Sequence, residues 1–173
     1  GQWRSNGHGD GRGDSFGGPA PGGVQAEHGV LWSAPPANGV VFLCDRATEG
    51  ECMRRSLFGL PGGNPRSEAL LDAISPASRL FLFNVHTRVM LGPFRAVCEP
   101  GRHLEHAWNG NFPLQVRVGA EARSGEVLHM AEPRIASWLR YDKPQKITQS
   151  LDAAQACGLG ELFERCGEPT CYT

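Results

Sequence analysis

The strongest structural signal in the chain is Leu80-Phe81-Leu82-Phe83-Asn84-Val85-His86-Thr87-Arg88-Val89-Met90-Leu91. Two runs rich in apolar, aromatic and β-branched residues flank a short polar turn, and the second run continues through Phe94 to Cys98. This pattern predicts a β-hairpin. The first run is apolar on both faces, so we expect a central strand that is covered on both sides or closed into a barrel.

Upstream of the hairpin, the sequence predicts one strand and two helical segments. Residues 39–44 form a short apolar run typical of a buried strand. Thr48 and Glu51 have the spacing of a helix capping box, which predicts a helix that continues to Phe58. We expect Gly59 to end that helix with a positive φ and Pro61 to prevent its continuation, while Phe58 and Leu60 cover the core. Residues 67–72 predict a brief helical turn.

Downstream, residues 114–118 alternate strictly between apolar and polar types. The alternation predicts a strand with Leu114, Val116 and Val118 inward and with Gln115 and Arg117 toward solvent. Residues 146–148 suggest a last short strand. Asp152 is positioned to cap a closing helix whose apolar residues recur at helical spacing.

Together these elements predict an α+β fold with a curved or partly closed, mainly antiparallel sheet or barrel of about five strands and flanking helices. We expect a flexible, glycine-rich N-terminal tail over residues 1–35, a folded domain over residues 36–165 and a frayed C-terminal tail over residues 166–173.

Composition limits the classes of partner and the compartment. The 17 Lys+Arg and 18 Asp+Glu residues leave a net charge of −1, which gives no whole-chain attraction to nucleic acid or anionic lipid. No apolar run is long enough for membrane insertion. The six cysteines are predicted to be free, since Cys44, Cys52 and Cys98 lie in apolar or helical segments. An intracellular, most simply cytoplasmic, location follows, with the nucleus or an organelle as alternatives.

Several short motifs occur in the order typical of one plant family. They are Phe42-Leu43-Cys44, Phe58-Gly59-Leu60-Pro61, Leu80-Phe81-Leu82-Phe83-Asn84, Gly92-Pro93-Phe94-Arg95-Ala96, Ala107-Trp108 and Phe112-Pro113-Leu114-Gln115-Val116-Arg117-Val118. Over residues 39–163 the chain resembles the plant-type Development and Cell Death (DCD) domain family, which includes N-rich proteins. The resemblance implies a fold similar to the PUA-like superfamily. It also implies a binding or adaptor module that acts through protein partners in stress response, development or programmed cell death, with binding of RNA or a modified nucleotide as the alternative.

The residues do not assemble into a recognisable catalytic or metal-binding motif. His103 and His106 form a His-x-x-His pair without a further ligand nearby, and Cys157, Cys166 and Cys171 lack a Cys-x-x-Cys pair. We therefore expect no enzymatic activity, no cofactor and no metal.

Candidate binding residues lie in the loop after the hairpin and on its neighbours. Trp108 sits among His103, His106 and Asn109, a mixture that suits the aromatic wall of a base or peptide pocket. The alternative is that Trp108 plugs the open end of the sheet. Four arginines would form a phosphate-binding face if they converge, and would otherwise be scattered and solvated: Arg54, Arg55, Arg95 and Arg117. The oligomeric state is not predicted.

Overall fold

The computed structural model describes residues 35–171. The tail predicted over residues 1–35 lies outside this range apart from its last residue. The predicted hairpin is confirmed as β3 (Ser78–Asn84) and β4 (Val89–Ala96), which pair antiparallel. The turn falls at residues 85–88, where the Arg88 N–H donates to the Asn84 carbonyl at 2.9 Å.

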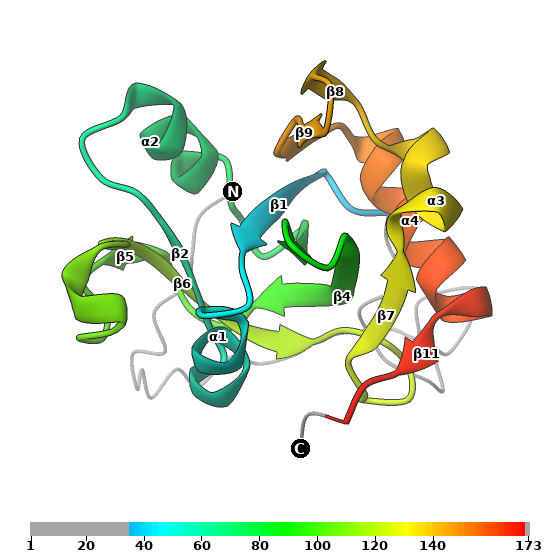
Figure 1. Cartoon of the computed structure of the whole chain (residues 1–173), viewed down its shortest axis with the longest axis horizontal. Coiled ribbons are helices and arrows are strands. Elements are labelled where there is room, and N and C mark those ends of the chain that lie inside the picture. Colours follow the sequence, from blue (N-terminus) through cyan, green and yellow to red (C-terminus); the bar gives the residue numbers. More distant parts are fainter. Residues whose placement is uncertain (1–34, 172–173) are drawn as a thin grey trace, which may run out of the picture.

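Around this hairpin the chain builds a curled sheet in the order β10-β1-β3-β4-β6-β2 (Figure 1). The other strands on this path are β1 (Asn38–Cys44), β2 (Leu57–Leu60), β6 (Leu114–Ala120) and β10 (Ser150–Leu151). The sheet curls until β2 contacts β1, so it is a half-barrel. The predicted α+β class and partly closed sheet are confirmed. The sheet is mixed, because β1 runs parallel to β3.

Strand β4 has different neighbours along its length. On the side away from β3, Val89–Gly92 pair with β7 (Leu128–Ala131), whereas Phe94–Ala96 pair with β6. A two-residue strand, β5 (Gly101–Arg102), pairs with β6, and β11 (Glu168–Pro169) pairs with β7. The C-terminal segment was predicted to be frayed, and this is wrong for β11, which joins the sheet.

Four α-helices cover the sheet within the described residues. They are α1 (Glu49–Arg55), α2 (Pro65–Asp72), α3 (Glu132–Ile135) and α4 (Ala153–Cys166). The predicted cap of the closing helix is confirmed, since the Asp152 carboxylate accepts from the Gln155 N–H at 2.8 Å and the Gln155 side chain accepts from the Asp152 N–H at 3.1 Å. Two 3-10 turns, η2 (Trp108–Gly110) and η3 (Ala136–Trp138), and a hairpin of β8 (Tyr141–Lys143) and β9 (Lys146–Ile147) complete the fold.

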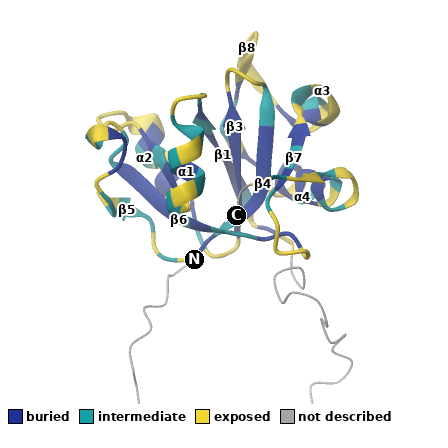
Figure 2. Ribbon diagram, turned by 60° about the horizontal axis from the view of Figure 1, so that its bottom comes forward, coloured by how far each residue is buried: buried dark blue, intermediate teal, exposed yellow. Residues whose placement is uncertain are grey.

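The sheet separates two hydrophobic cores, and Figure 2 shows the central strands buried between them. Leu80 and Leu82 of β3 face the inside of the curl, while Phe81 and Phe83 face α4. The inner core comprises Val40, Phe42, Cys44, Cys52, Leu57, Phe58, Leu60, Leu70, Leu71, Ile74, Leu80, Leu82, Leu91, Phe94, Ala96, Ala107, Trp108, Leu114, Val116 and Val118. The α4 core comprises Val41, Phe81, Phe83, Met90, Ala122, Leu128, Met130, Ile135, Leu139, Ile147, Leu151, Ala156, Leu159 and Phe163.

The first helix is shorter than predicted, and the role assigned to Gly59 is wrong. Helix α1 ends at Arg55, and Ser56 takes the left-handed conformation at φ 50°. Residues 57–60 then form β2, in which Gly59 pairs with Gln115 of β6. The Thr48 hydroxyl bonds to Asp45 rather than capping the helix. Phe58 and Leu60 do cover the core, as predicted.

Candidate functional site

The loop that was predicted to bind a ligand places its aromatic residue in the inner core. Trp108 is 7% exposed and packs edge-on against Phe112, with ring centroids 5.6 Å apart. Its indole N–H is buried without a hydrogen-bond partner. His103, His106 and Asn109 are exposed on the same loop. The structure therefore buries Trp108 in the inner core, while the three polar side chains of the loop are exposed.

Buried polar contacts hold this loop against the sheet. Gln115 was predicted to face solvent and is instead 1% exposed, because the loop folds over its side of β6. Its amide donates to the carbonyl oxygens of Glu105 and Phe112, each at 3.1 Å, and accepts from the Glu105 N–H at 2.9 Å. The backbone N–H of Trp108 donates to the Glu51 carboxylate at 3.0 Å, and this bond lowers the pKa of Glu51.

The four predicted arginines do not form one free cationic face. Arg55 pairs with Glu51 at 3.0 Å and with Glu105 at 3.2 Å, and Arg117 pairs with the other oxygen of Glu105 at 2.7 Å. Arg95 lies half-buried on β4 opposite Gly119. Arg54 is exposed on α1. The structure thus brings Arg55 and Arg117 together around the shared carboxylate of Glu105, and Glu105 and Glu51 together balance the two positive charges.

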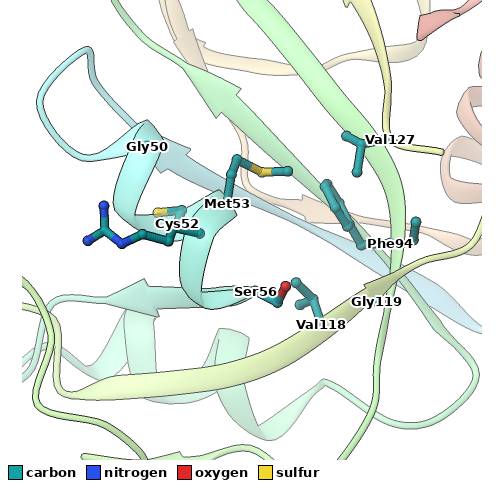
Figure 3. Close-up of a pocket in the computed structure, with 10 residues that line it drawn as sticks. Gly50, Cys52, Met53, Ser56, Phe94, Val118, Gly119 and Val127 are labelled. Atoms are coloured by element: carbon teal, nitrogen blue, oxygen red, sulfur yellow. The ribbon is translucent and has the colours of Figure 1, made fainter. Parts of the chain in front are cut away.

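A cavity of about 330 Å³ opens between α1 and the ends of β4 and β6 (Figure 3). We call it the α1 cavity. Met53 extends from the helix toward Phe94 and Val127, and Val118 lies below (Figure 3). The lining residues are Gly50, Cys52, Met53, Arg54, Ser56, Phe94, Val118, Gly119, Ala120 and Val127. The cavity lies beside the place where the partner of β4 changes from β7 to β6.

One turn and one glycine border this opening. The Ser56 carbonyl accepts from the Val118 N–H at 2.9 Å, which ties the end of α1 to β6. Gly50 contributes no side chain on the helix, and a Cβ there would meet nothing within 4 Å. A Cβ on Gly119 would instead meet the Val97 side chain at 3.1 Å, and Val97 is not part of the lining. The missing side chain at Gly50 is therefore the one that leaves space on the helix side.

The described lining of the α1 cavity holds one thiol and one charged side chain. Burial raises the pKa of the Cys52 thiol to about 12, so the thiol stays protonated and is a poor nucleophile at neutral pH. Of the ten described residues that line the cavity, Arg54 alone is charged, and none is a carboxylate or an imidazole. Among residues 35–171, no group of three or more His, Cys, Asp or Glu side chains is placed to hold a metal.

Sequence reasoning missed the α1 cavity because four separate segments supply its lining. A glycine in the first turn of a predicted helix was the one local sign, since Gly50 costs helix stability without an evident reason. It also missed a buried ion pair between Arg79, which is 2% exposed, and Glu121, with the two charged groups 3.5 Å apart. The sequence held one hint of this pair, because Arg79 directly precedes the apolar run that begins at Leu80.

Two further findings bear on the class of protein. All six cysteines lie in the described part of the chain, and none forms a disulfide. Cys44 and Cys52 pack in the inner core, as predicted. None of the described helices is long and apolar enough to cross a membrane.

The segment from β1 into α4 matches the sequence model of a known protein family. The family model "Development and cell death domain" matches residues 38–163, and the chain belongs to this family. Its relatives include the B2 protein of Daucus carota, which is 31% identical over 174 residues, a match that covers 88% of this chain and 77% of that protein.

Two longer relatives match over part of the domain. DCD domain-containing protein NRP-B of Glycine max is 38% identical over 88 residues, covering 46% of this chain and 26% of that protein. DCD domain-containing protein NRP of Arabidopsis thaliana is 36% identical over 88 residues, covering 46% of this chain and 24% of that protein. These relatives support the plant-type family that the motifs indicated.

Proposed function

We propose that this domain is a non-enzymatic protein-binding module, and that the α1 cavity receives a large apolar side chain from an extended segment of its partner. The observation that carries the proposal is the cavity itself. Met53, Phe94 and Val127 give it apolar walls, and Arg54 adds one positive charge. We infer a partner segment with an apolar anchor next to a carboxylate, because that pairing complements both features.

The small number of unpaired arginines at the α1 cavity favours a protein partner over nucleic acid there. A phosphate backbone is bound through several free cations, whereas Arg54 is the one cation among the described lining residues. Arg55 and Arg117, which lie outside the lining, pair with Glu51 and Glu105. The volume of the α1 cavity also suits one large side chain, since about 330 Å³ lies at the small end of the range for ligand pockets.

The family description sets the proposed context. We infer that the module acts as an adaptor in development, stress response or programmed cell death, inside the cell and through protein partners. The family name supports the first part. The free cysteines support an intracellular setting, because secreted domains of this size commonly carry disulfides.

The test compares two substitutions at one position. Gly50→Leu should fill the opening, whereas Gly50→Ala adds one methyl group and leaves most of it free, since a Cβ there has open space. A random peptide library displayed on phage is selected against the full chain, and the enriched peptides are titrated against each variant. We expect peptides with an aromatic or large aliphatic residue beside Asp or Glu. Their affinity should fall about tenfold or more for Gly50→Leu and little for Gly50→Ala.

A second variant guards against a leucine that turns away from the opening. Met53→Glu places a carboxylate in the apolar wall and should abolish the same binding. Thermal unfolding shows that each variant is folded before it is titrated. Selection of no peptide, or of peptides that bind all variants equally, contradicts the proposal.

A further inference from the structure

The β8–β9 hairpin projects from the body of the domain (Figures 1 and 2). Every residue from Arg140 to Lys146 is exposed. The hairpin carries both lysines of the chain, Lys143 and Lys146, and is followed by the buried Ile147, which anchors it in the α4 core. It is thus a fixed, cationic projection.

The two lysines face each other across the turn. Lys143 and Lys146 are direct partners in the register, with Pro144 and Gln145 between them, and Gln145 takes a φ of 64°. Like charges that lie directly opposite on a hairpin repel each other. An anion bound between them would relieve this repulsion, so the arrangement favours a negatively charged partner.

The surrounding ion pairs leave a positive excess. Arg140 pairs with Asp152 at 2.7 Å, and Arg66 of α2 pairs with Asp142 at 3.6 Å. Within residues 35–171, Lys143, Lys146 and the exposed Arg134 of α3 make no ion pair. Three cations therefore remain available to an anionic ligand.

Two partly exposed aromatic rings accompany these charges. Trp138 is 38% exposed and Tyr141 is 40% exposed. The inner side of the Trp138 ring lies against α4, because a Cβ on Gly158 would overlap it. The Tyr141 hydroxyl donates to the Glu132 carboxylate at 3.3 Å. Both side chains are thus held by a contact with the domain and remain partly exposed, and partly exposed aromatic rings can stack on bases.

A second opening adjoins the hairpin. It has a volume of about 230 Å³ and lies between α2 and β9, with Arg66 and Lys146 both in its lining. Its other residues are Leu70, Asp142, Ile147, Thr148, Gln149 and Ser150. Arg66 pairs with Asp142 there, so of the two described cations in this lining Lys146 is the one that makes no ion pair.

We propose that the hairpin surface, formed by Arg134, Trp138, Tyr141, Lys143 and Lys146, binds single-stranded nucleic acid. The cations contact phosphates and the rings stack on bases. An acidic peptide or an anionic membrane would match the charge but would not use the rings. This surface shares no lining residue with the α1 cavity, and the inference does not depend on the proposed function of that cavity.

The test measures fluorescence anisotropy of labelled oligo(U) and oligo(dT), each about a dozen nucleotides long, with the full chain at low and rising salt. Lys143→Ala/Lys146→Ala should weaken binding by roughly tenfold or more and reduce the slope of log K against log salt by about 1.4, since each lost single-strand phosphate contact removes about 0.7. The control Arg46→Ala/Arg123→Ala removes the same charge at two other exposed positions and should change the slope little.

The aromatic contribution is tested at Tyr141. Tyr141→Ala should weaken binding roughly fivefold to a hundredfold, whereas Tyr141→Phe keeps the ring and should retain affinity. Poly-Glu and vesicles of anionic phospholipid serve as competing probes. The proposal is overturned if neither oligonucleotide binds, if the two double variants behave alike, if Tyr141→Ala binds normally, or if poly-Glu or vesicles bind with the same dependence on Tyr141.

Discussion

The two cores that share the central sheet are closed in different ways. A single helix of 14 residues, α4, covers most of the α4 core. The small residues Ala156, Gly158 and Gly160 let neighbouring groups approach this helix closely. Several short pieces close the inner core: α1, α2 and the loop that carries Trp108. One long helix makes a continuous cover, whereas short segments leave an opening where they meet. We infer that α4 is the scaffold for the sheet and that the inner side, where the α1 cavity opens, is the side for the protein partner. The β8–β9 hairpin, which Ile147 anchors in the α4 core, carries the second proposed surface.

The largest effect is expected in the scaffold, at the buried pair of Arg79 and Glu121. The Arg79 guanidinium also donates to the Ala156 carbonyl at 3.1 Å, and Gly160 makes room for it. Desolvation lowers the pKa of Arg79 and raises that of Glu121, so each charge depends on the other. Arg79→Met should cost about 3–5 kcal/mol of unfolding free energy, because it removes the buried cation that offsets the charge of the Glu121 carboxylate. Denaturant unfolding measures this cost.

A matched surface pair and a double variant complete that experiment. Arg140→Met breaks the exposed pair with Asp152 and should cost at most about 1 kcal/mol. Arg79→Met/Glu121→Leu should regain most of the loss, because no buried charge is left alone. An Arg79→Met cost no greater than that of Arg140→Met would show that the α4 core does not depend on the pair.

The next effect is expected in the inner core, at Trp108. Trp108→Ala should cost about 3 kcal/mol, the low end for removal of a buried tryptophan, because the substitution also removes an indole N–H that is buried without a partner. Trp138→Ala removes the same side chain from a site that is 38% exposed and should cost less than half as much. Thermal and denaturant unfolding of both variants compare them directly. Equal costs would place Trp108 outside the inner core.

Local sequence pattern predicted much of the fold and little of the site. The β3–β4 hairpin, β1 and α4 follow from apolar periodicity and capping signals that lie within a few residues. The parallel pairing of β1 with β3 joins segments that are separated by α1, β2 and α2, and no local signal encodes it.

Positions decided by tertiary contacts were the ones predicted wrongly or missed. Gln115 alternates as a solvent-facing residue would, and a loop folded over it makes it buried. Ser56 turns the chain with a positive φ that Gly59 was expected to supply. The α1 cavity depends on Gly50, Met53, Phe94 and Val127 meeting in space, which no single segment reveals.

Gly59 offers a smaller test, at the crowded end of the inner core. A Cβ there would lie 2.7 Å from the Phe112 Cβ and 2.8 Å from the Trp108 ring. Gly59→Ala should therefore cost about 1–3 kcal/mol through overpacking, although Gly59 does not need a positive φ. Chemical unfolding gives the value. A neutral result would mean that the loop moves freely away from β2, and would weaken the description of Trp108 as a plug.

The smallest effect is expected at the open end of the same core, and its sign is opposite. Gly50 lies in the first turn of α1, and a Cβ there meets nothing within 4 Å. Gly50→Ala should raise the unfolding free energy by about 0.5 kcal/mol, because alanine loses less backbone entropy in a helix than glycine does. Replicate denaturant curves on the Gly50→Ala and Gly59→Ala proteins, analysed with a common slope, resolve the opposite signs. Stabilisation at Gly50 alone would mean that the chain keeps a glycine at the α1 cavity at the expense of stability, as expected where an opening serves binding. A loss at Gly50 would mean that the helix is already closely packed there, and the α1 cavity would not be open to a partner.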